Sequence, residues 1–379
     1  MDFERIARLE PLREAARRFA EREISPGVVS RDRQRAWDPA LLTRMAGSGL
    51  LGAMLPTGHG GRGLGALEAT ALLEGLGEGG EDAGLALAAG VHDFLCAVPL
   101  WKLGTEAQRR HYLPRMASGE WVGGLSLLEL EGGAARPGLR AGKQGQRWHL
   151  HGTKAWVVNA PIAHHFLLTA VTGTGRRSAF LVDRDTPGLH IGPRTGTPGP
   201  RTCLVAELTL EDVELPEESL LGTEGAALTE LLPLQLALER GLLIAPWVGI
   251  MRALTRRTVQ QARERELFSR PLGRFQSIRM TLADMETRCE LSTNLLYRTA
   301  WQLDHLAQPP RQDAAASRLF ISRAAQAVAR DAFQLHGLRG LEPDLHVERL
   351  YRDAMFLTLT GGGSEVLHSV IAGALLNLG

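Results

Sequence analysis

Apolar positions recur along this chain with two different periods, and the change of period divides the sequence into three stretches. Up to about residue 121 the period is helical, because Leu12, Ala16 and Phe19 follow one another at i, i+4 and i+7. Between about residues 122 and 222 the apolar residues form short runs separated by Gly, Pro and Thr, which predicts strands. Helical stripes then return, and the apolar residues from Phe275 to Cys289 alternate spacings of three and four, as in a packed bundle.

This order predicts a mostly α protein with a middle β domain. We expect an N-terminal helical domain over residues 1–121, a β domain over 122–222 and a C-terminal helical bundle over 223–379. The sequence has neither an internal repeat nor a low-complexity linker, which favours closely packed domains. A functional site is then expected between domains.

Composition and charge exclude several classes of protein. The 379 residues carry 43 Lys and Arg against 42 Asp and Glu, and this balance supplies no net field for a nucleic acid or an anionic membrane. The three cysteines are far apart and odd in number, which is typical of a reducing compartment and gives no disulfide framework. The N-terminus is charged, and we expect no apolar stretch to approach the length of a membrane span. Both points predict a cytoplasmic protein.

Three local motifs point to no chemistry. Gly58–Gly63 matches G-x-G-x-x-G, but it lies between helical stretches and is interpreted as a glycine loop, not a dinucleotide site. His164 and His165 are adjacent and have no carboxylate or thiol at a ligand spacing, so we expect no metal and place them at the surface or at a domain edge. The sequence contains no G-x-S-x-G motif, the pattern that would indicate a hydrolytic nucleophile.

The most informative pair is Glu239-Arg240, because no other charged side chain occurs between Glu230 and Arg252. A charge inside such an apolar helix must be paired, hydrogen-bonded or catalytic, since burying it alone costs several kcal/mol. The pattern leaves open whether the pair is a structural ion pair or a catalytic carboxylate with its neighbour. Pro246 is expected to kink this helix.

Several blocks of residues are spread across nearly the whole chain. They are 56–65, 150–160, 208–216, 265–268 with 275–276, 334–337 and 351–353. Together these blocks resemble the acyl-CoA dehydrogenase family. That resemblance implies an N-terminal helical domain, a β-barrel-like middle domain and a C-terminal four-helix bundle, with FAD between the last two and an acyl thioester beside it. It also implies a homodimer or homotetramer.

The resemblance also implies a catalytic base. Most of the family carries it just before a Gly-Thr-Ser/Asn-Glu motif near the C-terminus, but this chain has Gly361 in the matching place. In the long-chain and isovaleryl branches the glutamate comes instead from an earlier helix, immediately before an Arg. Glu239 is similar to that glutamate, and Arg240 would orient it or bind the substrate.

By the same resemblance a set of positions would contact FAD, and several of them depart from the family pattern. Hydroxyls are lost in the segment that begins at Leu128, at Val158 and at Gly363, which predicts altered redox tuning or weaker FAD binding. The matching positions are Leu128, Trp156, Val158, Arg265, Phe268, Gln276, Gln334, Gly337, Gly363 and Ser364.

The implied function is FAD-dependent α,β-dehydrogenation of an acyl thioester in a specialised pathway. The acyl group would be carried on CoA or on an acyl-carrier protein, and an electron-transfer flavoprotein or oxygen would accept the electrons. The lost hydroxyls keep one alternative open, which is a catalytically impaired relative that serves as a binding or assembly protein.

Overall fold

Helices build the first third of the chain. The computed structural model describes residues 9–127, 138–307 and 310–377. Three helices start at polar caps: the Asp38 carboxylate accepts from the Ala40 N–H at 3.0 Å, the Asp82 carboxylate accepts from the Leu85 N–H at 3.0 Å, and the Thr105 hydroxyl accepts from the Gln108 N–H at 3.2 Å. The helices are α2 (Glu10–Glu23), α3 (Val28–Gln34), α4 (Pro39–Gly47), α5 (Ala66–Gly80), α6 (Ala83–Gly90), the π-helical η3 (Val91–Ala97), α7 (Val98–Leu103) and α8 (Glu106–Ala117).

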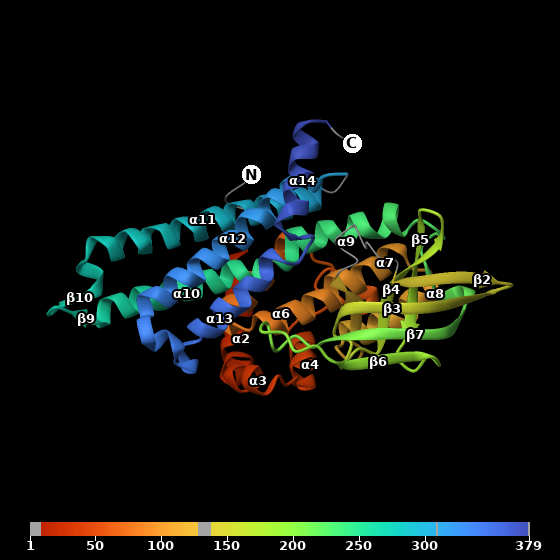
Figure 1. Ribbon diagram of the computed structural model, residues 1–379, viewed down its shortest axis with the longest axis horizontal. Helices are drawn as coiled ribbons and strands as arrows, with labels where there is room; N and C mark the ends of the chain where they lie inside the picture. Colours follow the sequence, from red (N-terminus) through yellow and green to blue (C-terminus); the bar gives the residue numbers. More distant parts are fainter. Residues whose placement is uncertain (1–8, 128–137, 308–309, 378–379) are drawn as a thin grey trace.

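The middle of the chain forms an eight-stranded sheet at one end of the molecule (Figure 1). The strand order is β6-β7-β3-β1-β4-β5-β8, and β2 pairs with both β3 and β4. Trp148 and Phe180 pack edge to face inside it, with ring centroids 5.2 Å apart. The strands are β1 (Gly123–Ser126), β2 (Leu139–Gln144), β3 (Arg147–Val158), β4 (His165–Gly173), β5 (Arg176–Asp183), β6 (Leu189–Arg194), β7 (Val205–Pro216) and β8 (Leu220–Leu221).

The rest of the chain is again helical, and the long helices α10, α11 and α12 lie side by side (Figure 1). A short hairpin at the end of the molecule opposite the sheet joins α10 to α11 (Figure 1). The elements are the π-helical η6 (Ala227–Leu231), α9 (Leu232–Leu238), the π-helical η7 (Glu239–Leu243), α10 (Ala245–Glu264), β9 (Glu266–Leu267), β10 (Arg270–Pro271), α11 (Gln276–His305), α12 (Arg311–His336), α13 (Val347–Ala354) and α14 (Gly363–Leu375). The predicted helical, β, helical order is confirmed.

Helix α5 touches its neighbours through glycines. A Cβ on Gly77 would collide with the backbone oxygen of Pro246 in α10, and a Cβ on Gly249 of α10 would collide with the Glu74 oxygen of α5. On the other side of α5, Gly75 lies against the backbone oxygen of Arg13 in α2. Only glycine allows helix backbones to approach so closely. The position of α10 is therefore set by direct backbone contact with α5.

Two continuous helical segments are long and apolar enough to span a bilayer by length and composition alone. They run over Ala83–Leu103 and Ala227–Glu264, which corrects the expectation that no apolar stretch approaches that length. Their most apolar windows are 94% and 78% buried inside the protein. Contacts within the fold therefore account for their apolar character.

His92 connects η3 to the first strand. Its Nδ1 accepts the Gly123 N–H at 3.0 Å, so Nε2 carries the proton and donates to the Met116 carbonyl at 3.1 Å. Burial lowers the pKa of this ring to about 4. His165 is also buried, and its ring lies 4.9 Å from that of Tyr112 in α8, so of its two expected places the surface is wrong and the domain edge is right. Burial lowers the pKa of His165 to about 3. The helical and β parts therefore meet at neutral histidines.

Replacing His92 by Gln is expected to change how the free energy of unfolding depends on pH. Between about pH 6.5 and pH 4 the unfolded His92 is protonated while the folded one is neutral, so its contribution to stability is lost as the pH falls. The stability difference between wild type and variant should shrink by about 1.4 kcal/mol per pH unit in that window. Urea unfolding at several pH values measures it, and a constant difference would contradict the prediction. Burial raises the pKa of Asp93 to about 7, so the contribution of Asp93 to stability depends on pH in the opposite direction. This contribution is present in both wild type and variant, and it cancels in their difference.

Candidate active site

The helix that carries Glu239 changes its winding at that residue. Helix α9 ends at Leu238, η7 is a π-helical turn, and α10 begins at Ala245. Pro246 lies in the first turn of α10, where its missing N–H breaks the regular hydrogen-bond pattern. A π-helical turn therefore ends just before Pro246, and the kink at this proline stays a prediction. Such turns are frequent at functional sites.

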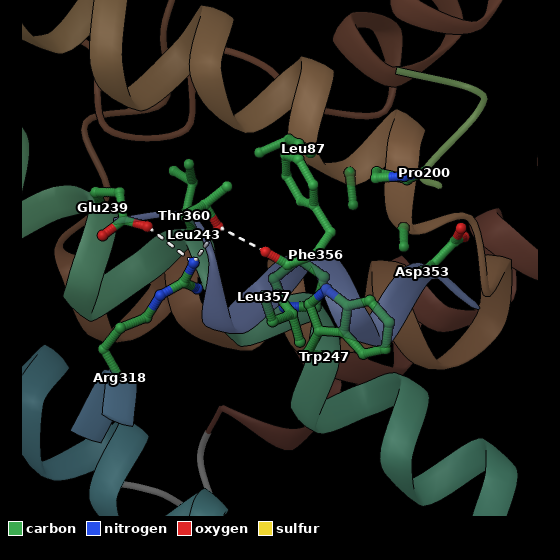
Figure 2. Close-up of a pocket in the computed structure, with 13 residues that line it drawn as sticks. Leu87, Pro200, Glu239, Leu243, Trp247, Arg318, Asp353, Phe356, Leu357 and Thr360 are labelled. Carbon is green, nitrogen blue, oxygen red and sulfur yellow. Dashed lines mark hydrogen bonds and ion pairs between the residues drawn. The ribbon is translucent and has the colours of Figure 1, made fainter. Parts of the chain in front are cut away.

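The Glu239 carboxylate is buried and has one strong partner. Its Oε1 lies 3.0 Å from Arg318 Nη2, and both side chains are nearly inaccessible to solvent. Arg318 Nη2 also donates to the Thr360 hydroxyl at 2.9 Å (Figure 2). Oε2 of Glu239 is buried and has no hydrogen-bond partner. One carboxylate oxygen is therefore held, and the other is free to accept a proton.

Gly361 leaves the space that this carboxylate occupies. A Cβ at residue 361 would lie 2.5 Å from Glu239 Oε2 and 2.6 Å from Oε1. Gly361 also has φ +73°, a conformation that favours glycine. The carboxyl group of Glu239 thus lies where a side chain at position 361 would begin.

Arg240 does not form the ion pair that its neighbouring position in the sequence suggested. The residue is 3% exposed, its Nε has no hydrogen-bond partner, and burial lowers the pKa of its guanidinium despite the charge of Glu239. It lines a cavity of about 150 Å³ together with Arg311 and apolar residues of η6, α9 and α12. The ion-pair partner of Glu239 is instead Arg318, 79 positions later in the sequence.

Two adjoining cavities meet at Phe356 and Thr360, which line both. The inner cavity is small, about 30 Å³, and contains Glu239 and Arg318 (Figure 2). The outer cavity has a volume of about 360 Å³, and Trp156 stands in its wall. The inner wall also includes Ala83, Leu87, Pro200, Leu243, Trp247 and Leu357, and the outer wall includes Leu127, Thr197, Gly199, Arg352, Met355 and Leu359.

The outer cavity fits a flat aromatic cofactor such as the flavin ring. Its volume lies in the range of small-molecule sites, and its walls are mostly apolar. Trp156 has φ +54° and is 39% exposed, so its indole is available for stacking. Thr197 and Thr360 supply hydroxyls to this cavity. Gly363 and Ser364, the first residues of α14, follow Thr360 closely in the sequence but are not among the residues that line the cavity.

Family models divide the chain as the fold does. The N-terminal domain of acyl-CoA dehydrogenases matches residues 7–120, the middle domain residues 131–213 and the C-terminal domain residues 230–376. The chain belongs to the acyl-CoA dehydrogenase family. It is an FAD-dependent oxidoreductase that dehydrogenates acyl thioesters.

Individual relatives span almost the full chain. An L-prolyl-[peptidyl-carrier protein] dehydrogenase from Pseudomonas fluorescens is 33% identical over 332 residues, covering 86% of this chain and 87% of the relative. The crystal structure of the prolyl acyl carrier protein oxidase AnaB has TM-score 0.92 and 29% identity, covering 97% of this chain and 98% of its own. The structure of PigA with FAD and proline has TM-score 0.92 and 27% identity, and covers 98% of both chains.

The expected cofactor residues of this acyl-CoA dehydrogenase separate into groups. Trp156 lines the outer cavity, whereas Val158 is fully buried in the core and pairs with strands on both sides. Leu128 lies outside the described residues. The altered residue at position 158 therefore presents no side-chain atom to the outer cavity.

Five other expected cofactor positions lie at the far end of the bundle, away from both cavities (Figure 1). Arg265 caps α10, and its Nη1 donates to the His336 carbonyl at 2.9 Å, next to Gly337. Phe268, in the turn of the β9–β10 hairpin, is 83% exposed. Gln276 at the start of α11 and Gln334 near the end of α12 are also exposed.

Sequence reasoning missed Arg318 and assigned no role to Thr360. A signal for Arg318 was present, because it is the only charged residue between Asp313 and Arg323 in an otherwise small and apolar stretch. The same argument that singled out Glu239 applies to it: a charge on a buried helix face needs a partner. Its partner could not be read from the sequence, since 79 residues separate the two.

Proposed function

We propose that this dehydrogenase acts on a small acyl group held as a thioester on a carrier protein, with Glu239 as the base. The observation that carries the proposal is the pair of adjoining cavities, with a free carboxylate oxygen in one and an exposed indole in the other. A substrate at their junction, beside Phe356 and Thr360, would have the base and the cofactor as neighbours. α,β-Dehydrogenation needs a base at the α-carbon and a hydride acceptor at the β-carbon.

The inner cavity supports a small acyl group. A volume of about 30 Å³ holds only about two water molecules. Leu87, Leu243, Trp247 and Leu357 form apolar walls, and Pro200 closes one side (Figure 2). With part of the acyl group at the junction beside Phe356 and Thr360, a group of a few carbons or a five-membered ring suits this space better than a long alkyl chain.

The choice of a carrier protein rests on relatives. The Pseudomonas fluorescens relative acts on L-prolyl-[peptidyl-carrier protein], and AnaB is a prolyl acyl carrier protein oxidase. The small inner cavity agrees with a prolyl-sized group. CoA remains the competing carrier, as the family name implies, and an electron-transfer flavoprotein or oxygen would accept the electrons.

In the proposed reaction Glu239 Oε2 takes the α-proton. The apolar walls exclude water, which strengthens electrostatic interactions with the developing enolate and protects it from side reactions. The hydride acceptor for the β-hydrogen and its electron pair would be supplied by bound FAD. Trp156, Gly363 and Ser364 would hold the flavin ring, and Arg240 would bind the thioester's arm at the 150 Å³ cavity that it lines.

The far group of cofactor positions supports an oligomer. Helix α10 is 20 residues long, so Arg265 lies roughly 30 Å from the end of the helix that adjoins Glu239. Arg265, Phe268, Gln276, Gln334 and Gly337 would therefore contact the FAD of a second copy. A homodimer, or a homotetramer of two such dimers, satisfies this requirement.

A visible spectrum followed by anaerobic addition of thioesters tests the proposal. The purified protein is expected to contain FAD that bleaches with a prolyl-sized group on a carrier protein, more rapidly than with the same group on CoA or with a long acyl chain. Rapid bleaching by acyl-CoA alone would refute the carrier. Bound FAD that no thioester bleaches, or failure to bind added FAD, would favour the binding or assembly protein.

A further inference from the structure

We infer that Arg318 is a positioning residue of the reaction: it holds Oε1 of Glu239, keeps the carboxylate ionised inside an apolar cavity, and leaves Oε2 to take the proton. This inference rests on the proposed role of Glu239. Arg318 lies outside both sequence segments in which the family resemblance places a base, the one around Glu239 and the one around Gly361.

The geometry is that of a clamp made by one nitrogen. Arg318 Nη2 lies 3.0 Å from Glu239 Oε1 and 2.9 Å from the Thr360 hydroxyl, which in turn donates to the Phe356 carbonyl at 3.4 Å (Figure 2). Arg318 stands on α12, Glu239 on η7, and Thr360 immediately before Gly361. The guanidinium of Arg318 therefore connects Glu239 to Thr360, the neighbour of Gly361. Gly361 has no side chain and so leaves room for the Glu239 carboxylate.

The charges around Glu239 leave Arg318 as its direct counter-ion. Arg240 is adjacent in sequence, but its guanidinium faces the other cavity, where Arg311 is a second cation. Asp353 of α13 lines the same inner cavity as Glu239, and burial raises its pKa to about 7. The residues that α6 and α10 contribute to this cavity are uncharged.

Loss of this contact would have two separate effects on the base. The carboxylate would lose its ion pair in an apolar cavity, where the neutral acid is favoured, so a larger fraction would be protonated at a given pH. It would also lose the hydrogen bond that fixes its rotamer. A purely structural arginine would affect stability and FAD content, but it would not move the pH at which Glu239 becomes active.

The test compares Arg318→Met and Arg318→Lys with the matched control Arg323→Met. Arg323 is an exposed arginine on the same helix, next to His368 and absent from both cavities. For each holoenzyme, kcat and KM for the bleaching thioester are measured against pH. In Arg318→Met the acidic limb of the kcat/KM profile is expected to move upward by roughly one to three pH units. Arg318→Lys should return it most of the way, and Arg323→Met should leave it unchanged.

Infrared spectroscopy supplies a readout that does not depend on turnover. The carbonyl stretch of a protonated carboxylic acid, assigned to Glu239 by its absence in Glu239→Gln, should appear at higher pH in Arg318→Met than in the parent. If Arg318→Met does not fold, Arg318→Lys alone decides, through a lower kcat with an unchanged KM. Unchanged pH profiles and infrared titrations in Arg318→Met would overturn the inference, as would an unchanged kcat in Arg318→Lys if only that variant folds. Full activity of Glu239→Gln would instead overturn the proposed base.

Discussion

Replacing Glu239 by Gln is expected to lower the rate of flavin reduction by about 10²- to 10⁴-fold, the usual contribution of a positioned general base. Glutamine has nearly the same shape, and its carbonyl oxygen can still accept from Arg318, so FAD binding and folding should persist. The measurement is anaerobic stopped-flow bleaching of the bound flavin by the preferred thioester. The variant should still bind the thioester, because the substitution removes the proton acceptor and leaves the cavity intact.

Glu74→Gln is the matched control. Glu74 is also buried in the helical core, where it pairs with Arg252 at 3.1 Å and accepts from the Tyr297 hydroxyl at 2.8 Å. It lines neither adjoining cavity. This control should lose stability but keep its rate of flavin reduction. Equal loss of rate in both variants would show that a buried charge, and not a base, had been removed.

Gly361→Ala is expected to lower the rate of flavin reduction by about 10²-fold while FAD content stays near that of the parent. The new Cβ would lie 2.5 Å from Glu239 Oε2, so the carboxylate must move away from its present position. A displacement of about 1 Å at a reacting group is sufficient for such a loss. The check is the same stopped-flow measurement, together with the protein-bound FAD absorbance.

Gly175→Ala separates this effect from backbone strain. Gly175 has φ +70°, close to the φ +73° of Gly361, but no atom lies within 4 Å of its added Cβ. Both alanines carry the cost of a left-handed conformation, about 1–2 kcal/mol. Only Gly361→Ala should lose rate. If both lose it equally, collision with Glu239 is not the reason for glycine at position 361.

The order of the fold could be predicted because hydrophobic periodicity is local. The stripe over Phe275–Cys289 is part of α11, and the short apolar runs after residue 122 are strands. The domain boundaries at 121 and 222 remain predictions. The length of the buried helical segment Ala227–Glu264 was missed, because Glu239, Arg240 and Pro246 interrupt its apolar run in the sequence. In the structure a π-helical turn joins α9 to α10 across this interruption.

The site was predicted less completely because its members come from distant segments. Glu239 was singled out by the cost of a charge on an apolar helix, and the structure places it in a cavity wall. The same cost of burying a charge applies to Arg318, but the residues near it in the sequence do not indicate which carboxylate it pairs with. The hydroxyl losses were only partly interpretable, since Val158 proves to be fully buried and Leu128 lies outside the described residues.

The glycine contacts between α5 and α10 have a mechanical consequence. Side chains can change rotamer to absorb a small error, but two backbones in contact cannot, so the spacing of these helices has almost no tolerance. Pro246 lies seven residues after Glu239, and its backbone contacts Gly77. A larger side chain at position 77 would therefore push Pro246 away from α5 and shift the π-helical turn that carries Glu239. The position of the proposed base thus depends in part on Gly77, a residue that lines neither of the two adjoining cavities.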